Sequence, residues 1–99
     1  MTSKQPKTNR IRVPAHVVSI IRKSHPDIKK KIRAGLEYIL NEPGAGKSLK
    51  DELAGLKSSR VGRFRIIYRI STKNIIEIVA IGPRKTIYKE TFKLIKNNG

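Results

Sequence analysis

Arginine alternates with apolar residues along positions 63–70, in a pattern that could recognise a phosphate group. With the two-residue period of a strand, the residues fall on two faces, and only Ile67 interrupts the basic one. The basic face carries Arg63, Arg65 and Arg69, and the apolar face carries Phe64, Ile66, Tyr68 and Ile70. A planar guanidinium suits bidentate contact with phosphate, so we expect the apolar face to meet a core and the arginine face to meet a polyanion. Residues 57–73 hold six basic residues and no acidic one, which predicts that local pairing does not neutralise this face.

A second group of reactive residues follows the last apolar run of the chain. Arg84 and Tyr88 stand four residues apart, directly after Gly82 and Pro83. A guanidinium can neutralise the charge that develops on a phosphodiester under attack, and a tyrosine can stack on a base or exchange a proton. For Tyr88 a purely structural place at the core edge is an equal alternative, whereas Tyr68 is predicted to lie in the core.

Other residues that could do chemistry lack the necessary companions. Residues 41–48 resemble a phosphate-binding loop, but they follow a predicted helix instead of joining a strand to a helix. His16 and His25 have no partners suited to catalysis or metal binding, so we interpret them as surface or capping residues. The seven carboxylates are scattered, and Glu77 is expected to pair with an arginine across the sheet. We therefore expect no metal and no cofactor.

The charge of the chain indicates a polyanionic partner. Lys and Arg number 23 against 7 Asp and Glu, which gives a net charge of +16 and an isoelectric point near 10.8. Such self-repulsion favours binding to nucleic acid, or to an acidic protein. The absence of cysteine excludes disulfides. No apolar run is long enough for a membrane span, and the first ten residues lack the apolar segment of a secretory signal, so we expect no membrane partner and a cytoplasmic protein.

Hydrophobic periodicity predicts the elements that must position these residues. Residues 1–9 are expected to form a flexible basic tail, and residues 10–99 a single domain. Strands are predicted at 10–13, 57–61, 64–71 and 75–81, and helices at 14–24, 26–41 and 88–96. The resulting fold is α+β, with two N-terminal helices packed on one face of a mostly antiparallel four-stranded sheet, in the order β-α-α-β-β-β with a short C-terminal helix. The other face is expected to be open and basic, and the almost wholly apolar strand at 75–81 is expected to be central.

Three motifs, in this order and spacing, resemble the RelE/ParE toxin superfamily of type II toxin–antitoxin systems. The resemblance covers essentially residues 10–93. The motifs are Leu49-Lys50-x-x-Leu53-x-Gly55, Arg60-Val-Gly-x-Phe-Arg65-Ile-Ile-Tyr68 and Ile81-Gly82-x-Arg84-x-x-Ile87-Tyr88.

The resemblance implies a RelE-like mRNA interferase, which is a ribosome-dependent and metal-independent endoribonuclease that inhibits translation. The reaction it implies is attack of a ribose 2′-hydroxyl on the adjacent phosphate of mRNA. The implied partners are the ribosome, mRNA and a cognate acidic antitoxin. The alternative within the same superfamily is a ParE-like inhibitor of DNA gyrase, which has the same fold and cleaves nothing.

The resemblance also implies roles for individual residues. By position, Arg65 would contact the scissile phosphate, Arg84 would stabilise the transition state, and Tyr88 would stack or help to activate the 2′-hydroxyl. Some RelE proteins use two alternating lysines on the preceding strand, whereas this chain has Ser58 and Ser59 between its only basic residues there, so Lys57 is a weak candidate for the general base. The residues expected to bind RNA are Arg60, Arg63, Arg69 and Lys85.

Overall fold

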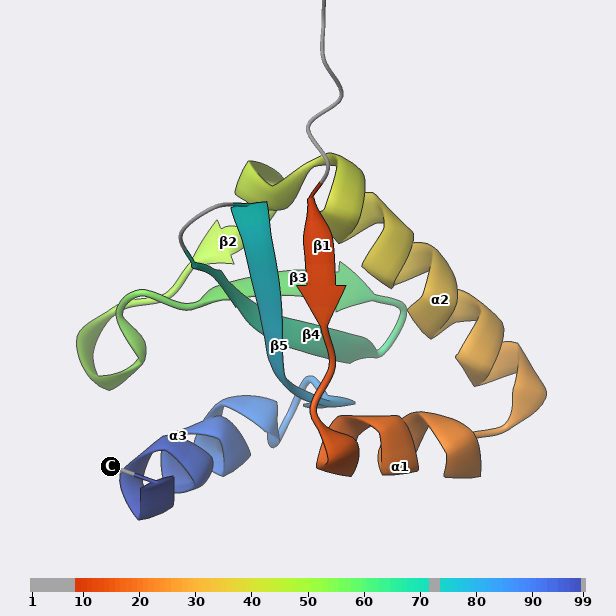
Figure 1. Ribbon diagram of the computed structural model, residues 1–99. Coiled ribbons are helices and arrows are strands. Elements are labelled where there is room, and N and C mark those ends of the chain that lie inside the picture. The colour runs from red at the N-terminus through yellow and green to blue at the C-terminus, as the bar shows by residue number, and fades with distance from the viewer. Residues whose placement is uncertain (1–8, 72–73, 99) are drawn as a thin grey trace, which may run out of the picture.

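A computed structural model describes residues 9–71 and 74–98, so the predicted tail lies outside the described residues except for Asn9. The helices and strands follow the predicted order with one addition, β2, and two short 3₁₀ turns (Figure 1). The elements are β1 (Arg10–Arg12), α1 (Ala15–Lys23), α2 (Pro26–Asn41), η1 (Pro43–Ala45), β2 (Lys47–Ser48), η2 (Asp51–Leu53), β3 (Lys57–Val61), β4 (Phe64–Ile70), β5 (Ile75–Pro83) and α3 (Ile87–Asn98). None of the helices in the described part of the chain combines the length and apolar character that a membrane span needs.

The strands form one sheet of five, in the order β1-β5-β4-β3-β2. Only β1 and β5 run parallel, and the other neighbours are antiparallel, so the predicted α+β class and mostly antiparallel sheet are confirmed. The predicted count of four strands is one too few. Strand β2 has two residues, Lys47 and Ser48, which pair with Ser58 and Lys57 at the sheet edge. Two residues are too few to show an alternating pattern in the sequence.

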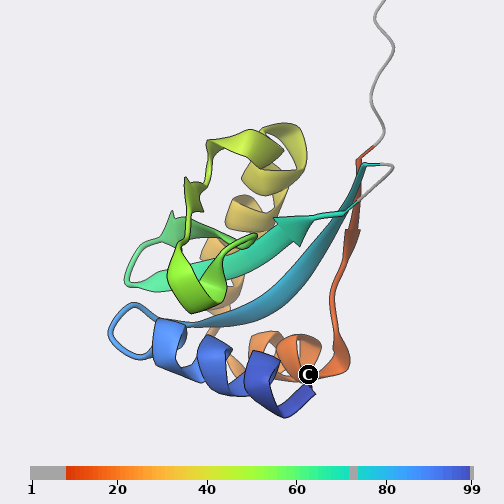
Figure 2. The ribbon, with the colours of Figure 1, turned by 90° about the vertical axis from the view of Figure 1, so that its left-hand side faces the viewer.

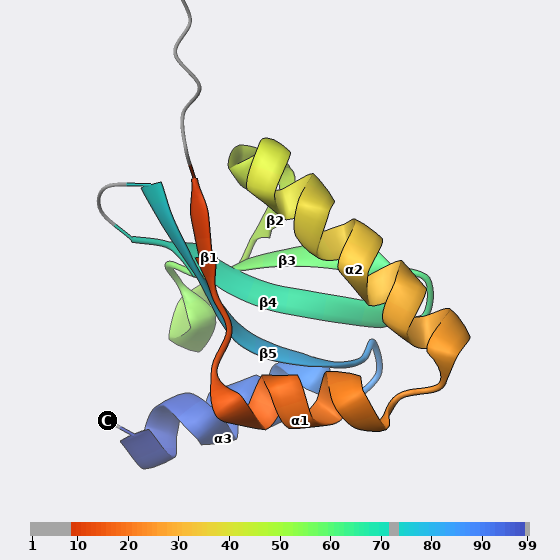
Figure 3. The same ribbon diagram turned by 45° about the vertical axis from the view of Figure 1, so that its right-hand side comes forward.

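Helices α1 and α2 cover one face of the sheet, which we call the helix face (Figure 3). The apolar stripe of α2 places Ile32 and Ile39 in a core with Ile66 and Tyr68 of β4, and all four are fully buried. Pro26 occupies the first turn of α2, where its missing N–H costs no hydrogen bond.

The cap of α2 confirms the capping interpretation for one histidine. The ring Nδ1 of His25 accepts a hydrogen bond from the Asp27 N–H at 3.1 Å, which satisfies one of the free donors at the start of the helix. The other histidine, His16, is exposed, and its Nε2 lies 3.0 Å from the carbonyl oxygen of Val79.

The opposite face, which we call the site face, is not open as predicted. Helix α3 and the segment around η2 lie over part of it (Figure 2). A second, smaller core holds Ile67 and Ala80 from the sheet, Ile87 from α3, and Leu56. Ile67, the one apolar residue among the arginines, is fully buried there, because it is the sheet's contact with this cover. Strand β5 thus has both faces covered, as its apolar sequence predicted.

Tyr68 forms hydrogen bonds between the core of the helix face and the segment before β2. Its hydroxyl donates to the Pro43 carbonyl at 2.8 Å and accepts from the Gly46 N–H at 3.2 Å. The side chain is fully buried, which confirms the predicted core position. Burial raises the pKa of Tyr68 above the ordinary value of 10.0, the hydrogen bond from Gly46 opposes this, and nearby Tyr38 adds to the rise.

We predict that Tyr68→Phe lowers the free energy of unfolding by about 1–3 kcal/mol at neutral pH, because two partly buried backbone groups lose their partner. The raised pKa of Tyr68 contributes stability that is fully present below the unfolded-state pKa and is lost as the pH rises through the folded-state pKa. The parent should therefore lose more stability than Tyr68→Phe between about pH 8 and pH 11. Urea unfolding at both pH values measures this, and equal losses in the two proteins would contradict it.

Candidate active site

The antiparallel pair β3 and β4 brings Arg65 and Ser58 together on the site face, where α3 adds Tyr88. The Nη1 of Arg65 donates a hydrogen bond to the Ser58 Oγ at 3.1 Å. The same Oγ lies 3.1 Å from the Tyr88 hydroxyl, and either group can be the donor. Ser58 is only 2% exposed, so its hydroxyl holds the arginine and the tyrosine in fixed positions. We call these three residues the central trio.

The positive charge around the central trio is not neutralised within the described residues. Arg60 lies directly opposite Arg65 across β3 and β4, an arrangement of like charges that costs stability unless an anion separates them. Among the described residues, no ion pair involves the arginines of this region, which are Arg60, Arg63, Arg65 and Arg84. The Nε of Arg65 is buried and has no hydrogen-bond partner there. A buried donor without a partner is costly, so it favours a site that an acceptor such as a phosphate oxygen completes.

Two turns meet at the end of the sheet beside the trio. The Arg84 N–H donates to the Arg63 carbonyl at 3.0 Å, which joins the β3–β4 turn to the β5–α3 turn. The side chains of Arg63, Arg84 and Lys85 are exposed in these turns. The structure therefore gathers these three predicted residues near Arg65, which pairs with Gly82 across β4 and β5.

Gly82 allows α3 to approach the sheet closely. A Cβ at this position would lie 2.9 Å from the Ile87 Cδ1, which is tighter than side-chain contacts permit. Ile87 is fully buried at the start of α3 and fixes the helix against the sheet. Since Tyr88 is the next residue, this contact sets the place of its ring and hydroxyl.

Tyr88 lies at the core edge and also has its hydroxyl at the central trio. Its ring packs against the smaller core, and its hydroxyl reaches Ser58. The ring also borders a hollow of about 350 Å³, whose other lining residues belong to the segment at 47–53. The hollow combines lysines, apolar side chains and one carboxylate, and its lining includes Lys47, Leu49, Lys50, Asp51, Leu53 and Tyr88. Such a surface can hold a base and its phosphate together.

Lys57 is not brought to the central trio. Successive strand residues point to opposite faces, so Lys57 lies on the face opposite to Ser58. In the sheet it pairs with Tyr68 of the helix face, and its Nζ donates to the Ser48 Oγ at 3.0 Å. The placement of Lys57 therefore corrects its candidacy as general base. The resemblance made it a weak candidate as the lysine of the preceding strand, but the alternation of the strand points its side chain to the other face.

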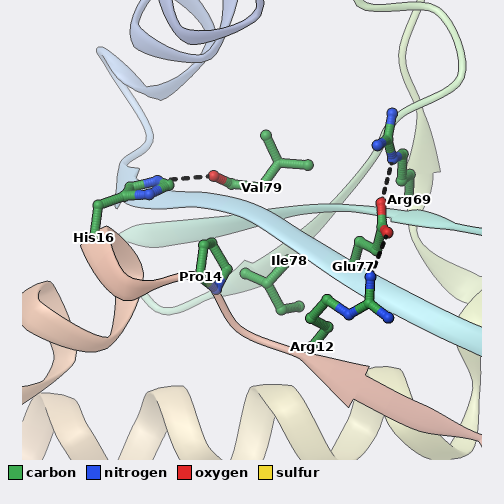
Figure 4. A pocket seen from close by; sticks show the side chains of 7 residues that line it. All are labelled: Arg12, Pro14, His16, Arg69, Glu77, Ile78 and Val79. Atoms are coloured by element: carbon green, nitrogen blue, oxygen red, sulfur yellow. Dashed lines mark hydrogen bonds and ion pairs between the residues drawn. The ribbon is translucent and has the colours of Figure 1, made fainter. Parts of the chain in front are cut away.

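Arg69 lies at the other end of β4, where a carboxylate from outside residues 57–73 forms an ion pair with it. Its Nε is 2.7 Å from Glu77 Oε1, and Arg12 Nη1 is 3.3 Å from Glu77 Oε2 (Figure 4). The predicted pairing of Glu77 with an arginine is confirmed. The carboxylate belongs to β5 and comes opposite Arg69 only through the sheet register, so no pattern within residues 57–73 could show it.

We predict that Arg69→Ala weakens RNA binding less than Arg63→Ala. The charge of Arg69 is shared with Glu77, whereas Arg63 is exposed with no ion pair among the described residues. Each free cation that contacts phosphate steepens the salt dependence of binding, so Arg63→Ala should reduce the slope of log affinity against log salt by about one and Arg69→Ala by less. Titration of ribosomes at several salt concentrations measures both slopes, and an equal reduction would contradict the prediction.

Two residues of this site escaped the sequence analysis. Ser58 is not among the predicted site residues, although strand alternation with Arg60 places it on the arginine face. Lys47 is not among them either, because the segment at 41–48 lacks the context of a phosphate-binding loop. In the described part of the chain, no group of three or more carboxylate or imidazole side chains could hold a metal ion.

Comparisons with known proteins show which family and fold this chain resembles. Residues 10–88 match the family described as the ParE toxin of type II toxin-antitoxin system, parDE. A chain of the RelBE2 toxin–antitoxin complex from Mycobacterium tuberculosis is 28% identical with a TM-score of 0.68, and the match covers 78% of this chain and 99% of that one. A mutant of the Escherichia coli toxin RelE in the free state has a TM-score of 0.70 at 14% identity, with 91% and 97% covered. The archaeal RelE–RelB complex from Pyrococcus horikoshii gives 0.63 at 23%, with 78% and 96% covered. No curated protein sequence matches.

Proposed function

This chain belongs to the ParE toxin family of type II toxin–antitoxin systems, within the RelE/ParE superfamily, and from that premise we propose that it is a ribosome-dependent endoribonuclease that cleaves mRNA. The observation that carries the proposal is the central trio. A half-buried guanidinium with a free buried Nε is held by a buried hydroxyl against a tyrosine. A guanidinium with an unused donor suits contact with a phosphate group, which supports RNA cleavage as the function.

The proposed reaction is an internal transfer at one phosphodiester. The ribose 2′-oxygen attacks the adjacent phosphorus, a new O2′–P bond forms, and the P–O5′ bond breaks. The 2′-hydroxyl proton passes to a base, and the departing 5′-oxygen takes up a proton. The products are a 2′,3′-cyclic phosphate and a 5′-hydroxyl end, and nothing is oxidised or reduced.

The site residues divide the work of this reaction among them. Arg65 and Arg84 neutralise the negative charge that grows on the phosphate oxygens in the transition state. The Tyr88 ring stacks on a base at the hollow. Its hydroxyl, which is hydrogen-bonded to Ser58, helps to activate the 2′-hydroxyl by exchanging its proton. The exposed cations Arg60, Arg63 and Lys85 position the RNA and the ribosome through phosphate contacts.

The proposed partners follow from the charge of the chain. With a net charge of +16, the protein attracts ribosomal RNA and mRNA in the cytoplasm, and an acidic antitoxin would neutralise it. The related structures from M. tuberculosis and P. horikoshii are toxin–antitoxin complexes, which supports a cognate antitoxin for this chain.

A second candidate function is inhibition of DNA gyrase without cleavage. The family match carries the ParE description, and the site face lacks a lysine on β3, which favour this alternative. Expression of the chain without a partner separates the two functions. We expect growth to stop, protein synthesis to fall at once, and new 5′-hydroxyl mRNA ends to map within translated regions. Continued translation together with gyrase-linked DNA breaks would establish the inhibitor instead.

A further inference from the structure

We propose that Lys47, on the edge strand β2, supplies the ammonium group that contacts the scissile phosphate in this active site. The inference rests on the proposed nuclease function and adds to it a phosphate-binding residue from a strand outside the β3–β4 pair.

The sheet register places Lys47 beside the central trio. Lys47 pairs directly with Ser58 across the antiparallel strands β2 and β3. Residues that pair in this way point to the same face, with Cβ atoms about 5 Å apart. The Ser58 hydroxyl forms hydrogen bonds with both Arg65 and Tyr88. The side chain of Lys47 therefore begins directly beside the residue that joins these two.

The hollow beside Tyr88 supports the same placement independently of the register. Lys47 and Tyr88 line one volume of about 350 Å³, which lies within the range of small-molecule sites. Lys47 is exposed, and no ion pair among the described residues engages it. A flexible ammonium group at the rim of the hollow can therefore reach a phosphate whose neighbouring base stacks on Tyr88.

The other nearby lysines are less suited to this role. Lys57 points to the helix face and donates to Ser48. Lys50 also borders the hollow, but it lies beyond β2 and does not pair with Ser58, and its immediate neighbours Asp51 and Glu52 carry negative charges that oppose an anion. Lys47 alone, of these three, shares the face of Ser58 and the hollow of Tyr88.

The proposed role is a positive charge and not a proton acceptor. The ammonium of Lys47 would face the phosphate oxygens, where it stabilises the transition state with Arg65. A second cation of different shape at this place should then restore much of the rate, whereas an exchange for a neutral side chain should not.

Single-turnover cleavage of mRNA on programmed ribosomes tests the inference, with the parent, Lys47→Ala, Lys47→Arg and the charge-matched control Lys23→Ala at the end of α1. We expect Lys47→Ala to lower the rate at saturating ribosome about 100-fold, Lys47→Arg to keep at least about a tenth of the parent rate, and Lys23→Ala to match the parent. The ribosome concentration that gives half of the maximal rate should change less than threefold in Lys47→Ala. Circular dichroism confirms that each variant is folded.

The outcomes separate this inference from the proposed function. A parent that cleaves, with Lys47→Ala as fast as the parent, overturns the role of Lys47 and leaves the nuclease standing. A parent that does not cleave programmed mRNA overturns both. A loss in Lys47→Ala that appears only in the half-maximal concentration makes Lys47 a general RNA contact and also overturns the proposal. If Lys57→Ala, measured in the same assay, shows the large loss of cleavage rate instead, Lys57 and not Lys47 serves the site, and the proposal is overturned.

Discussion

Replacement of Arg65 by alanine should reduce mRNA cleavage on programmed ribosomes by about 100- to 1000-fold, or roughly 3–4 kcal/mol of transition-state stabilisation. Arg65 is the one guanidinium that the fold fixes at the trio, through its hydrogen bond to the Ser58 Oγ at 3.1 Å, and its Nε is buried with no acceptor among the described residues. Arg65→Lys should recover little, because an ammonium cannot offer the two donors of the planar fork. Single-turnover rates measure both variants.

Arg69→Ala is the matched control for this experiment. Arg69 lies four residues along the same strand and on the same face, yet it forms an ion pair with Glu77. We expect this variant to retain most of the parent rate, since the charge of Arg69 is engaged by Glu77. It should also remain folded, since an exposed ion pair contributes no more than about 1 kcal/mol to stability. Equal losses in Arg65→Ala and Arg69→Ala would mean that the strand acts only through its total charge, and the assignment of the site to Arg65 would fail.

Tyr88→Phe should lower the cleavage rate about 100-fold at saturating ribosome, and Tyr88→Ala about 1000-fold. The first change removes the hydroxyl that meets Ser58 and keeps the ring against Leu53 and the smaller core. The second removes the ring as well, so it should also raise the half-maximal ribosome concentration, because stacking on a base contributes to binding.

Ser58→Ala provides the comparison for the tyrosine variants. It leaves the Tyr88 hydroxyl in place and removes the group that holds it and Arg65. We expect an intermediate loss of rate, with the ribosome concentration for half-maximal rate unchanged. If Tyr88→Phe cleaves as fast as the parent, the hydroxyl takes no part in the reaction, and Tyr88 serves only as a stacking surface.

The sequence predicted the secondary structure well because the periodicities are strong and local. The boundaries of β3 were predicted to the residue, and those of α2 and β4 to within one residue. The two faces of β4 also followed from alternation, as the burial of Ile66 and Tyr68 shows, although Ile70 at the end of the strand is 45% exposed and was wrongly expected to meet the core. These features depend on neighbours in the chain, so the sequence alone contains them.

What could not be predicted depends on contacts between distant segments. An arginine partner for Glu77 was predicted, but that the partner is Arg69 follows from the register of β4 and β5, and the cover over Ile67 follows from the return of α3. Likewise, the proximity of Lys47 to Ser58 requires a two-residue strand at the sheet edge. Each was invisible because no local pattern encodes which strand residues come opposite one another.

The hydrogen bonds of the Tyr68 hydroxyl to Pro43 and Gly46 should also limit the opening of the edge strand β2. They anchor the chain directly before Lys47 to the centre of the helix-face core. A two-residue strand at a sheet edge would ordinarily open on its own many times before the domain unfolds. With this anchor, its amides should exchange with solvent at rates close to those of the buried strands, and in Tyr68→Phe they should exchange much faster. The position of Lys47 at the edge of the site would thus depend on a side chain that lies on the opposite face of the sheet.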